Sequence, residues 1–200
     1  MMPDKRKLSE KIKEHLSEVQ PKKIPDDNIL YRHAGVLIPL FMEDGIWKVL
    51  FTKRTDNVTH HKGQISFPGG SVDEKDNSIE DAVLREADEE IGLKKKDVEI
   101  LGRIDDVTAL VSNFILHPYV GFIPCPYNFI INRGEVERLI KVPLKVFNNA
   151  GNPESKKRYI KYDRQVYYGF VYEYESDLIW GATARIMANF MKVVGNNLLL

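Results

Sequence analysis

The sequence predicts an α/β protein of one domain, an α/β/α sandwich around a mixed β-sheet. Three observations support this fold class. The chain has 200 residues, enough to bury one sizeable core. Strand-like stretches occupy much of its length, and amphipathic helical patterns occur near both ends and in the middle. Short strands mixed with a few helices are typical of a sheet covered by helices on both faces.

The first element expected is an amphipathic helix from Lys7 to Val19. Its apolar side consists of Leu8, Ile12, Leu16 and Val19. A linker containing Pro21 and Pro25 follows. The chain is therefore expected to divide into an N-terminal helix and linker, 1–28, and a main domain, 29–197. The helix is expected to cap either this domain or a second subunit in a homodimer.

A series of strands is expected next. Gly35 to Met42 and Trp47 to Lys53 are joined by the hairpin signal Glu43-Asp44-Gly45. A loop and strand from Thr59 to Gly70 lead into a central helix. Further strands are expected at Val98 to Ile104, Ile115 to Ile123, Phe129 to Asn132, Val136 to Lys141, Tyr159 to Tyr162 and Val166 to Tyr174. A last helix from Ala182 to Val194 closes the fold, with its core-facing side at Ile186, Phe190 and Val194.

The aromatic residues near the C-terminus are expected to pack in the core on alternating strand faces, rather than to form a platform for stacking bases. They are Tyr167, Tyr168, Phe170, Tyr172, Tyr174 and Trp180.

Composition argues against several classes of partner. Basic and acidic residues both number 29, so there is no general field to attract nucleic acid or an anionic membrane, and neither is expected as a partner. Cys125 is the only cysteine, which excludes an internal disulfide, and a small buried hydrophobe is its expected role. The N-terminus has no apolar run of signal or transmembrane length, so a cytoplasmic location is expected.

The most informative feature is an acidic run that follows a glycine pair. Gly69-Gly70 precede the stretch Arg85-Glu86-Ala87-Asp88-Glu89-Glu90-Ile91-Gly92-Leu93. On a helix, Glu86, Glu89 and Glu90 share one face because they are three and four residues apart. Oxygen ligands at this density suit Mg²⁺ or Mn²⁺. A solvated glutamate-rich face is the competing interpretation of any single pair, and the whole constellation favours a metal site.

The ends of this central helix are also predicted. Ser78 followed by Asp81 is a variant of the capping box at its start, and Gly92 is a suitable end. The apolar side that would pack on the core consists of Ile79, Ala82, Val83, Ala87 and Ile91.

The helix and the glycine pair together resemble the Nudix box, G-x5-E-x7-R-E-U-x-E-E-x-G-U, where U is a bulky apolar residue. The right half fits closely, with the small Ala87 at the first U. In the left half, Asp76 stands where the box has Glu, and eight residues separate it from Arg85. The same departure is characteristic of one branch of the family, the coenzyme A pyrophosphatases.

That branch has an upstream signature, L-L-T-x-R-[SA]-x3-R-x3-G-x3-F-P-G-G. The chain matches it in register with Leu50-Phe51-Thr52-Lys53-Arg54-Thr55, Gly63 and Phe67-Pro68-Gly69-Gly70. Phe51 and Thr55 are mild replacements, and Thr59 stands where the signature has its second Arg. Lys62 or His60 is a candidate to replace that cation. The resemblance covers roughly Ala34 to Val194.

The resemblance implies a Nudix-type enzyme that hydrolyses the diphosphate linkage of coenzyme A or a CoA derivative. The implied products are adenosine 3′,5′-bisphosphate and 4′-phosphopantetheine, and the implied cofactor is Mg²⁺ or Mn²⁺. The implied metal ligands are the carboxylates of Glu86, Glu89 and Glu90 and the backbone carbonyl of Gly69. Arg85 is expected to orient a carboxylate through charge-assisted hydrogen bonds.

Glu86 or Glu90 is the first expectation for the general base. Glu135 is the second, because several family members use a carboxylate on a later loop, although a loop charge at a strand entry explains Glu135 equally well. Arg54 is expected to face phosphate. Phe67 is expected either to line the pocket or to belong to the core.

Two alternatives stay open in the sequence. The same machinery could act on another small nucleoside diphosphate derivative, such as ADP-ribose, a dinucleotide or a dinucleoside polyphosphate, and Thr59 favours this. A catalytically silent nucleotide-binding module is the other alternative, and the intact metal-ligand positions argue against it.

Overall fold

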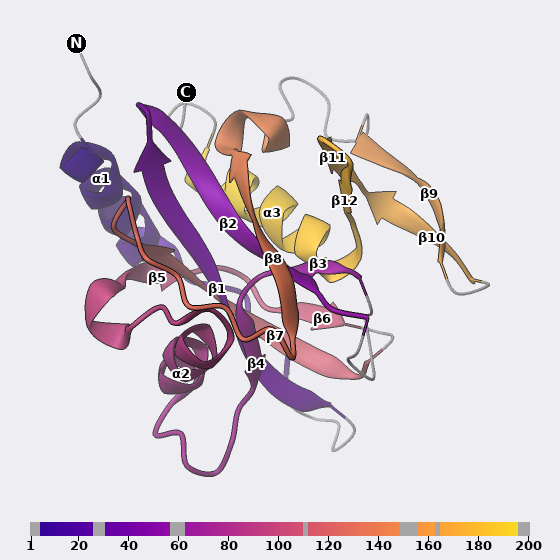
Figure 1. The fold of residues 1–200 in the computed structure, drawn as a ribbon, viewed down its shortest axis with the longest axis horizontal. Coiled ribbons are helices and arrows are strands. Elements are labelled where there is room, and N and C mark those ends of the chain that lie inside the picture. The colour runs from indigo at the N-terminus through magenta and orange to yellow at the C-terminus, as the bar shows by residue number, and fades with distance from the viewer. Residues whose placement is uncertain are drawn as a thin grey trace.

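The computed structural model describes residues 5–25, 31–56, 63–109, 112–148, 156–162 and 165–195. A mixed sheet forms the centre of the molecule (Figure 1). β1 (Arg32–Glu43) pairs antiparallel with β2 (Ile46–Arg54) and with β4 (Gly69–Ser71), and parallel with β7 (Phe114–Phe122). β1 thus connects the glycine pair to the centre of the sheet.

Four more strands complete this sheet of eight. They are β3 (Ile65–Ser66), β5 (Glu99–Arg103), β6 (Val107–Ala109) and β8 (Val136–Pro143). β3 and β8 pair with β2, whereas β5 and β6 pair with β7. Two short 3₁₀ helices, η1 (Lys95–Asp97) and η2 (Leu144–Phe147), follow α2 and β8.

Helices cover both faces of the sheet, which confirms the predicted α/β/α sandwich. α2 (Ile79–Ile91) lies on one face, and α1 (Lys5–Glu18) and α3 (Gly181–Val194) lie on the other (Figure 1). Alternate residues of β1 point to opposite sides, so that Leu37 packs with the α2 side and Ile38 with the α1 and α3 side. A strand buried on both faces is apolar almost throughout, as β1 is.

The apolar sides predicted for the two terminal helices are confirmed except at Val19, which lies beyond the end of α1 and outside the core clusters. Ile12 and Leu16 of α1 are buried in the same core cluster as Ile186 and Phe190 of α3. α1 packs against β5 of its own chain, so it caps this domain.

The strand predicted from Phe129 to Asn132 is wrong. The segment runs past the end of α2, where the amides of Ile130 and Asn132 donate to the carbonyls of Ile91 (3.0 Å) and Glu90 (2.9 Å). The last carbonyls of a helix have no partner within the helix, and this segment supplies one. The chain is therefore held beside the acidic end of α2.

The single strand predicted from Val166 to Tyr174 is two strands. β10 (Gln165–Phe170) pairs with β9 (Lys157–Tyr162), and β11 (Tyr172–Tyr174) pairs with β12 (Asp177–Ile179). Tyr172 is buried as predicted, but Tyr168 is 59% exposed, so the core interpretation is wrong for Tyr168. Cys125 is half-buried, and its Sγ lies 3.9 Å from Oε1 of Glu43.

Candidate active site

The carboxylates are presented by α2, whose ends are fixed as the sequence predicts. The Ser78 side chain accepts a hydrogen bond from the amide of Asp81 (3.0 Å) at the start. Gly92 ends the helix in the left-handed conformation, with φ of 69°. The buried side of the helix contains Ala82, Val83, Ala87 and Ile91. Burial of that side fixes the rotation of α2, and it brings Glu86 against β4.

The glycine pair is required by close contacts. A Cβ on Gly70 would lie 2.5 Å from Cδ of Glu86, so a side chain there would displace this carboxylate. Gly69 has a φ of 151°, and a Cβ on it would lie 2.2 Å from the carbonyl oxygen of Gly35. At Gly69 both the positive φ and the contact with backbone exclude a side chain, whereas at Gly70 a side chain would fit only if the carboxylate of Glu86 moved away.

Glu90 is a buried carboxyl group with few partners. Its side chain is 3% exposed, and its Oε2 accepts a hydrogen bond from the amide of Gly69 (3.2 Å). Nη1 of Arg54 lies 3.8 Å from its Oε1. Burial raises the pKa of Glu90 to about 8 against the smaller opposing effects of Gly69 and Arg54. Nε of Arg54 is itself buried without a hydrogen-bond partner among the described residues.

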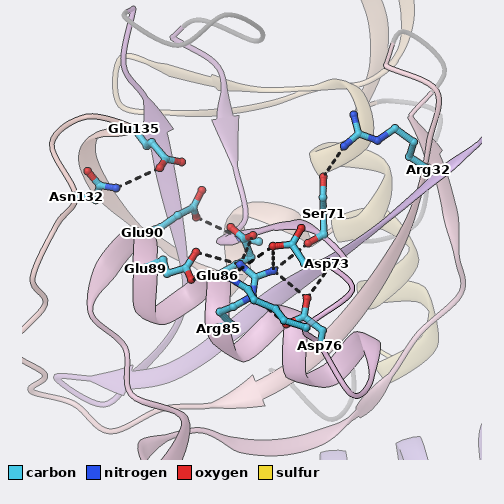
Figure 2. Close-up of polar contacts among 12 residues, drawn as sticks. Arg32, Ser71, Asp73, Asp76, Arg85, Glu86, Glu89, Glu90, Asn132 and Glu135 are labelled. Carbon is cyan, nitrogen blue, oxygen red and sulfur yellow. Dashed lines mark hydrogen bonds and ion pairs between the residues drawn. The ribbon is translucent and has the colours of Figure 1, made fainter.

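Arg85 connects Glu86 and Glu89 to strand β4, which contains the glycine pair (Figure 2). Its Nη1 donates to Oε1 of Glu86 (2.7 Å) and to Oε2 of Glu89 (3.0 Å). Its Nη2 donates to the carbonyl of Ser71 at the end of β4 (3.1 Å). The planar guanidinium can hold this arrangement because its donors form a rigid fork.

Asp76 holds the other side of the same guanidinium. Nε and Nη2 of Arg85 donate to its Oδ1 (2.9 Å) and Oδ2 (3.0 Å). These bonds lower the pKa of Asp76 from 3.8 to about 2. This chain differs from the Nudix box in having the shorter Asp76 and one extra residue before Arg85. Asp76 nevertheless contacts Arg85 through both of its carboxylate oxygens.

Glu135 lies just before β8, and the preceding segment is hydrogen-bonded to the end of α2 through Ile130 and Asn132. Its Oε1 accepts a hydrogen bond from the side-chain amide of Asn132 (3.2 Å), and its side chain is exposed near Glu90 (Figure 2). Its charge is one of the influences that raise the pKa of Glu86 and Glu90, after the larger effect of burial. The structure thus brings Glu135 to the carboxylate face of α2.

Phe67 is the predicted site residue that the structure places elsewhere. Its ring is 3% exposed and packs against Phe51 with a centroid distance of 4.8 Å, which is a core position. Thr59, His60 and Lys62 lie outside the described residues. Asn132 was missed by sequence reasoning, because its contacts with Glu90 and Glu135 have no signal in local spacing.

The donor set fits a hard divalent cation. All the side chains gathered here that could bind a cation are carboxylates, and the buried Glu90 has little compensating charge. As the side chains stand, no three His, Cys, Asp or Glu residues of the described ranges converge on one point. Arg85 holds one oxygen each of Glu86 and Glu89, so these carboxylates would share their charge between Arg85 and the cation.

The fold, and a helix that presents a run of carboxylates beside a glycine pair, are typical of hydrolases that cleave phosphoric anhydrides. The family model described as the NUDIX domain matches residues 31–177, and the chain belongs to the Nudix family. The protein is a Nudix pyrophosphohydrolase, which confirms the prediction of an enzyme. Its partners are small nucleoside diphosphate substrates, and enzymes of this family generally need divalent metal ions.

Curated relatives have the same family name. The chain is 34% identical over 169 residues to the uncharacterized Nudix hydrolase NudL of Photorhabdus laumondii, covering 84% of this chain and 86% of that protein. It is 31% identical over 172 residues to NudL of Escherichia fergusonii, with 84% and 86% covered. A MutT/nudix family protein from Enterococcus faecalis shares the fold at a TM-score of 0.54 and 15% identity, over 97% of this chain and 76% of that one.

None of the described helices has both the length and the apolar character needed to cross a bilayer.

Proposed function

We propose that the protein hydrolyses the diphosphate linkage of coenzyme A or a CoA derivative, giving adenosine 3′,5′-bisphosphate and 4′-phosphopantetheine products. The observation that carries this proposal is the upstream signature, which the chain matches in register with its glycine pair. Arg54 of that signature lies 3.8 Å from the buried Glu90, so the signature and the carboxylate helix meet at one place.

The proposal assigns the metal ligands as predicted. They are the carboxylates of Glu86, Glu89 and Glu90 and the backbone carbonyl of Gly69. A bound Mg²⁺ or Mn²⁺ would neutralise diphosphate oxygens and lower the pKa of a bound water. Arg85 is a positioning residue, because it holds Glu86 and Glu89 and is itself held by Asp76. Arg54 is the proposed contact to substrate phosphate, because its guanidinium lies beside Glu90 and its side chain is 25% exposed.

In the reaction, the oxygen of water bonds to one phosphorus while the bridging oxygen leaves with the other, and the water gives up a proton. Glu86 or Glu90 on α2 is the first choice to accept that proton, and Glu135 is the second. Comparing pH–rate profiles of Glu86→Gln, Glu90→Gln and Glu135→Gln distinguishes them. Loss of the acidic limb of the profile identifies the base, whereas loss of metal affinity identifies a ligand.

A second candidate keeps the same machinery for ADP-ribose, a dinucleotide or a dinucleoside polyphosphate. The observation that favours it is Thr59, which replaces the second arginine of the signature. With one cation fewer at the phosphates, recognition of the 3′-phosphate of coenzyme A would be weaker.

Turnover of a substrate panel with Mg²⁺ or Mn²⁺ and identification of the products by mass spectrometry tests the two candidates. We expect coenzyme A or an acyl-CoA to have the highest kcat/KM and dephospho-CoA a lower one. Glu89→Gln is the inactive control. If coenzyme A ranks below ADP-ribose, NADH and diadenosine polyphosphates, the CoA proposal is wrong and the second candidate stands.

A further inference from the structure

The β9–β10 hairpin has one face turned away from the protein. Figure 1 shows the hairpin at the side of the molecule beyond α3, and β10 contacts that helix. On the inner face, the ring of Tyr167 packs against Trp180 with a centroid distance of 5.3 Å. The strand register places another set on the outer face: Lys157, Tyr159, Lys161, Val166 and Tyr168. Phe170, at the end of β10, packs instead against the core.

Two tyrosines form an exposed pair at the centre of this outer face. Tyr159 and Tyr168 are directly opposite in the register, and their rings lie 4.8 Å apart between centroids. Tyr159 is 74% exposed and Tyr168 is 59% exposed. Large aromatic rings are usually buried to a greater extent, so an exposed pair on a strand surface indicates a surface for contact with another molecule.

The side chains beside this pair on the outer face carry positive charge, while Arg158 of the same hairpin is paired with Glu173 of β11 (2.5 Å). Lys157 and Lys161 lie on the same face, on either side of Tyr159, and the ammonium of Lys157 lies 5.2 Å from the ring centroid of Phe170. The described residues 156–162 and 165–170 contain four basic residues and no acidic one. In a chain of zero formal net charge, this is a local positive field.

We propose that the outer face of the β9–β10 hairpin binds single-stranded nucleic acid, with bases stacked on Tyr159 and Tyr168 and phosphates beside Lys157 and Lys161. Aromatic rings flanked by basic residues on an open strand surface suit a flexible polyanion with flat bases. A single nucleotide would need an enclosed pocket to bury most of its surface, and these rings are open to solvent. A second copy meeting the same face would bring both pairs of lysines together.

The test is fluorescence anisotropy of a labelled oligouridylate or oligodeoxythymidylate, about 10 nucleotides long, titrated with the full chain. At low salt we expect a Kd of roughly 10⁻⁴ to 10⁻⁶ M. Tyr159→Ala with Tyr168→Ala should weaken binding at least about tenfold, because base stacking contributes about 1–3 kcal/mol per base. Replacement of both tyrosines by Phe should retain binding.

Charge is tested with a matched pair of lysines. Lys161→Glu should weaken binding, whereas Lys96→Glu, at an exposed position on the η1 helix, should not. The melting temperature and the diphosphate hydrolysis rate of each variant report that the domain is folded. The proposal is overturned by absence of binding at about 10⁻⁴ M protein, by equal affinity of the double Ala variant, or by equal losses from both lysine variants. It is also overturned if light scattering finds a dimer that the double Ala variant converts to a monomer.

Discussion

Glu86, Glu89 and Glu90 lie on one helix but in three different environments. The side chain of Glu90 is 3% exposed, that of Glu86 is 17% exposed, and that of Glu89 is 52% exposed. Burial raises the pKa of Glu90 to about 8 and also raises that of Glu86. Folding therefore opposes the ionisation of Glu90 most strongly, and a cation bound there would recover that cost.

Glu90→Gln is expected to abolish hydrolysis and to stabilise the metal-free protein near neutral pH. The folded pKa of about 8 lies above the ordinary 4.5, so the folded state keeps a proton that the unfolded chain loses. The stability of the unmodified protein should therefore fall as pH rises from 4.5 to 8, and Gln, which does not titrate, should escape this loss. The gain at pH 7 is on the order of 3 kcal/mol.

Urea unfolding with a chelator at about pH 5 and about pH 8 measures this difference. Glu89→Gln is the matched control, because the exposed Glu89 should change stability little while also removing activity. A Glu90→Gln protein no more stable than the unmodified protein at the higher pH contradicts the prediction.

Asp76→Asn is expected to loosen Arg85 and so to disorient Glu86. Loss of the charged hydrogen bonds should cost about 1–3 kcal/mol, and kcat should fall about 10- to 100-fold. The pKa of Asp76 is depressed from 3.8 to about 2, so its stabilisation is complete above 3.8 and is lost as pH falls through about 2. Asp76→Glu, which restores the acid of the Nudix box, should recover more activity than Asn. Equal activity of the unmodified and Asn proteins would show that Arg85 needs no such anchor.

At the scale of elements, β4 and α2 form one unit. The amide of Gly69 donates to Glu90, and the carbonyl of Ser71 accepts from Arg85, so the strand fixes the helix carboxylates at both of its ends. Gly70 between them leaves room for the carboxylate of Glu86. A short strand of small residues is what this close approach requires.

Gly70→Ala is therefore expected to displace Glu86 and lower kcat/KM at least about 100-fold, with a smaller effect on stability. The added Cβ would lie 2.5 Å from Cδ of Glu86, which is closer than two carbon atoms can approach, so Glu86 would have to move. Gly169→Ala is the control, since a Cβ there meets no atom within 4 Å. Steady-state kinetics at several metal concentrations measure both variants. Unchanged kinetics for Gly70→Ala would mean that the position of Glu86 does not matter to the reaction.

The sequence predicts those features of these elements that depend on near neighbours. The cap at Ser78 and the end at Gly92 follow from local spacing and are confirmed, and so is the buried side of α2 except at Ile79, which is only half-buried. The contacts of Ile130 and Asn132 with the end of α2 join residues about 40 positions apart, for which no periodic signal exists. The burial of Glu90 also depends on residues distant in the sequence, because it is set by the packing of β4 on α2.

At the scale of the molecule, the N-terminal segment is part of the core. Ile12 is fully buried, and a Cβ on Gly102 of β5 would lie 2.8 Å from Cβ of Leu16. The linker is fixed as well, since the amide of Lys22 donates to Oδ1 of Asp105 (2.8 Å). We propose that residues 29–197 form the catalytic domain and that residues 1–28 complete its core.

Ile12→Ala is expected to lower the free energy of unfolding by about 2–5 kcal/mol, because it leaves a cavity in the main core cluster. The kcat of the folded variant should not change, since α1 and the carboxylates of α2 lie on opposite faces of the sheet. Urea unfolding and steady-state kinetics below the unfolding midpoint measure the two effects, with Lys11→Ala, on the exposed side of α1, as the control. If Ile12→Ala is as stable as Lys11→Ala, the helix contributes nothing to the core, and the domain boundary lies after it.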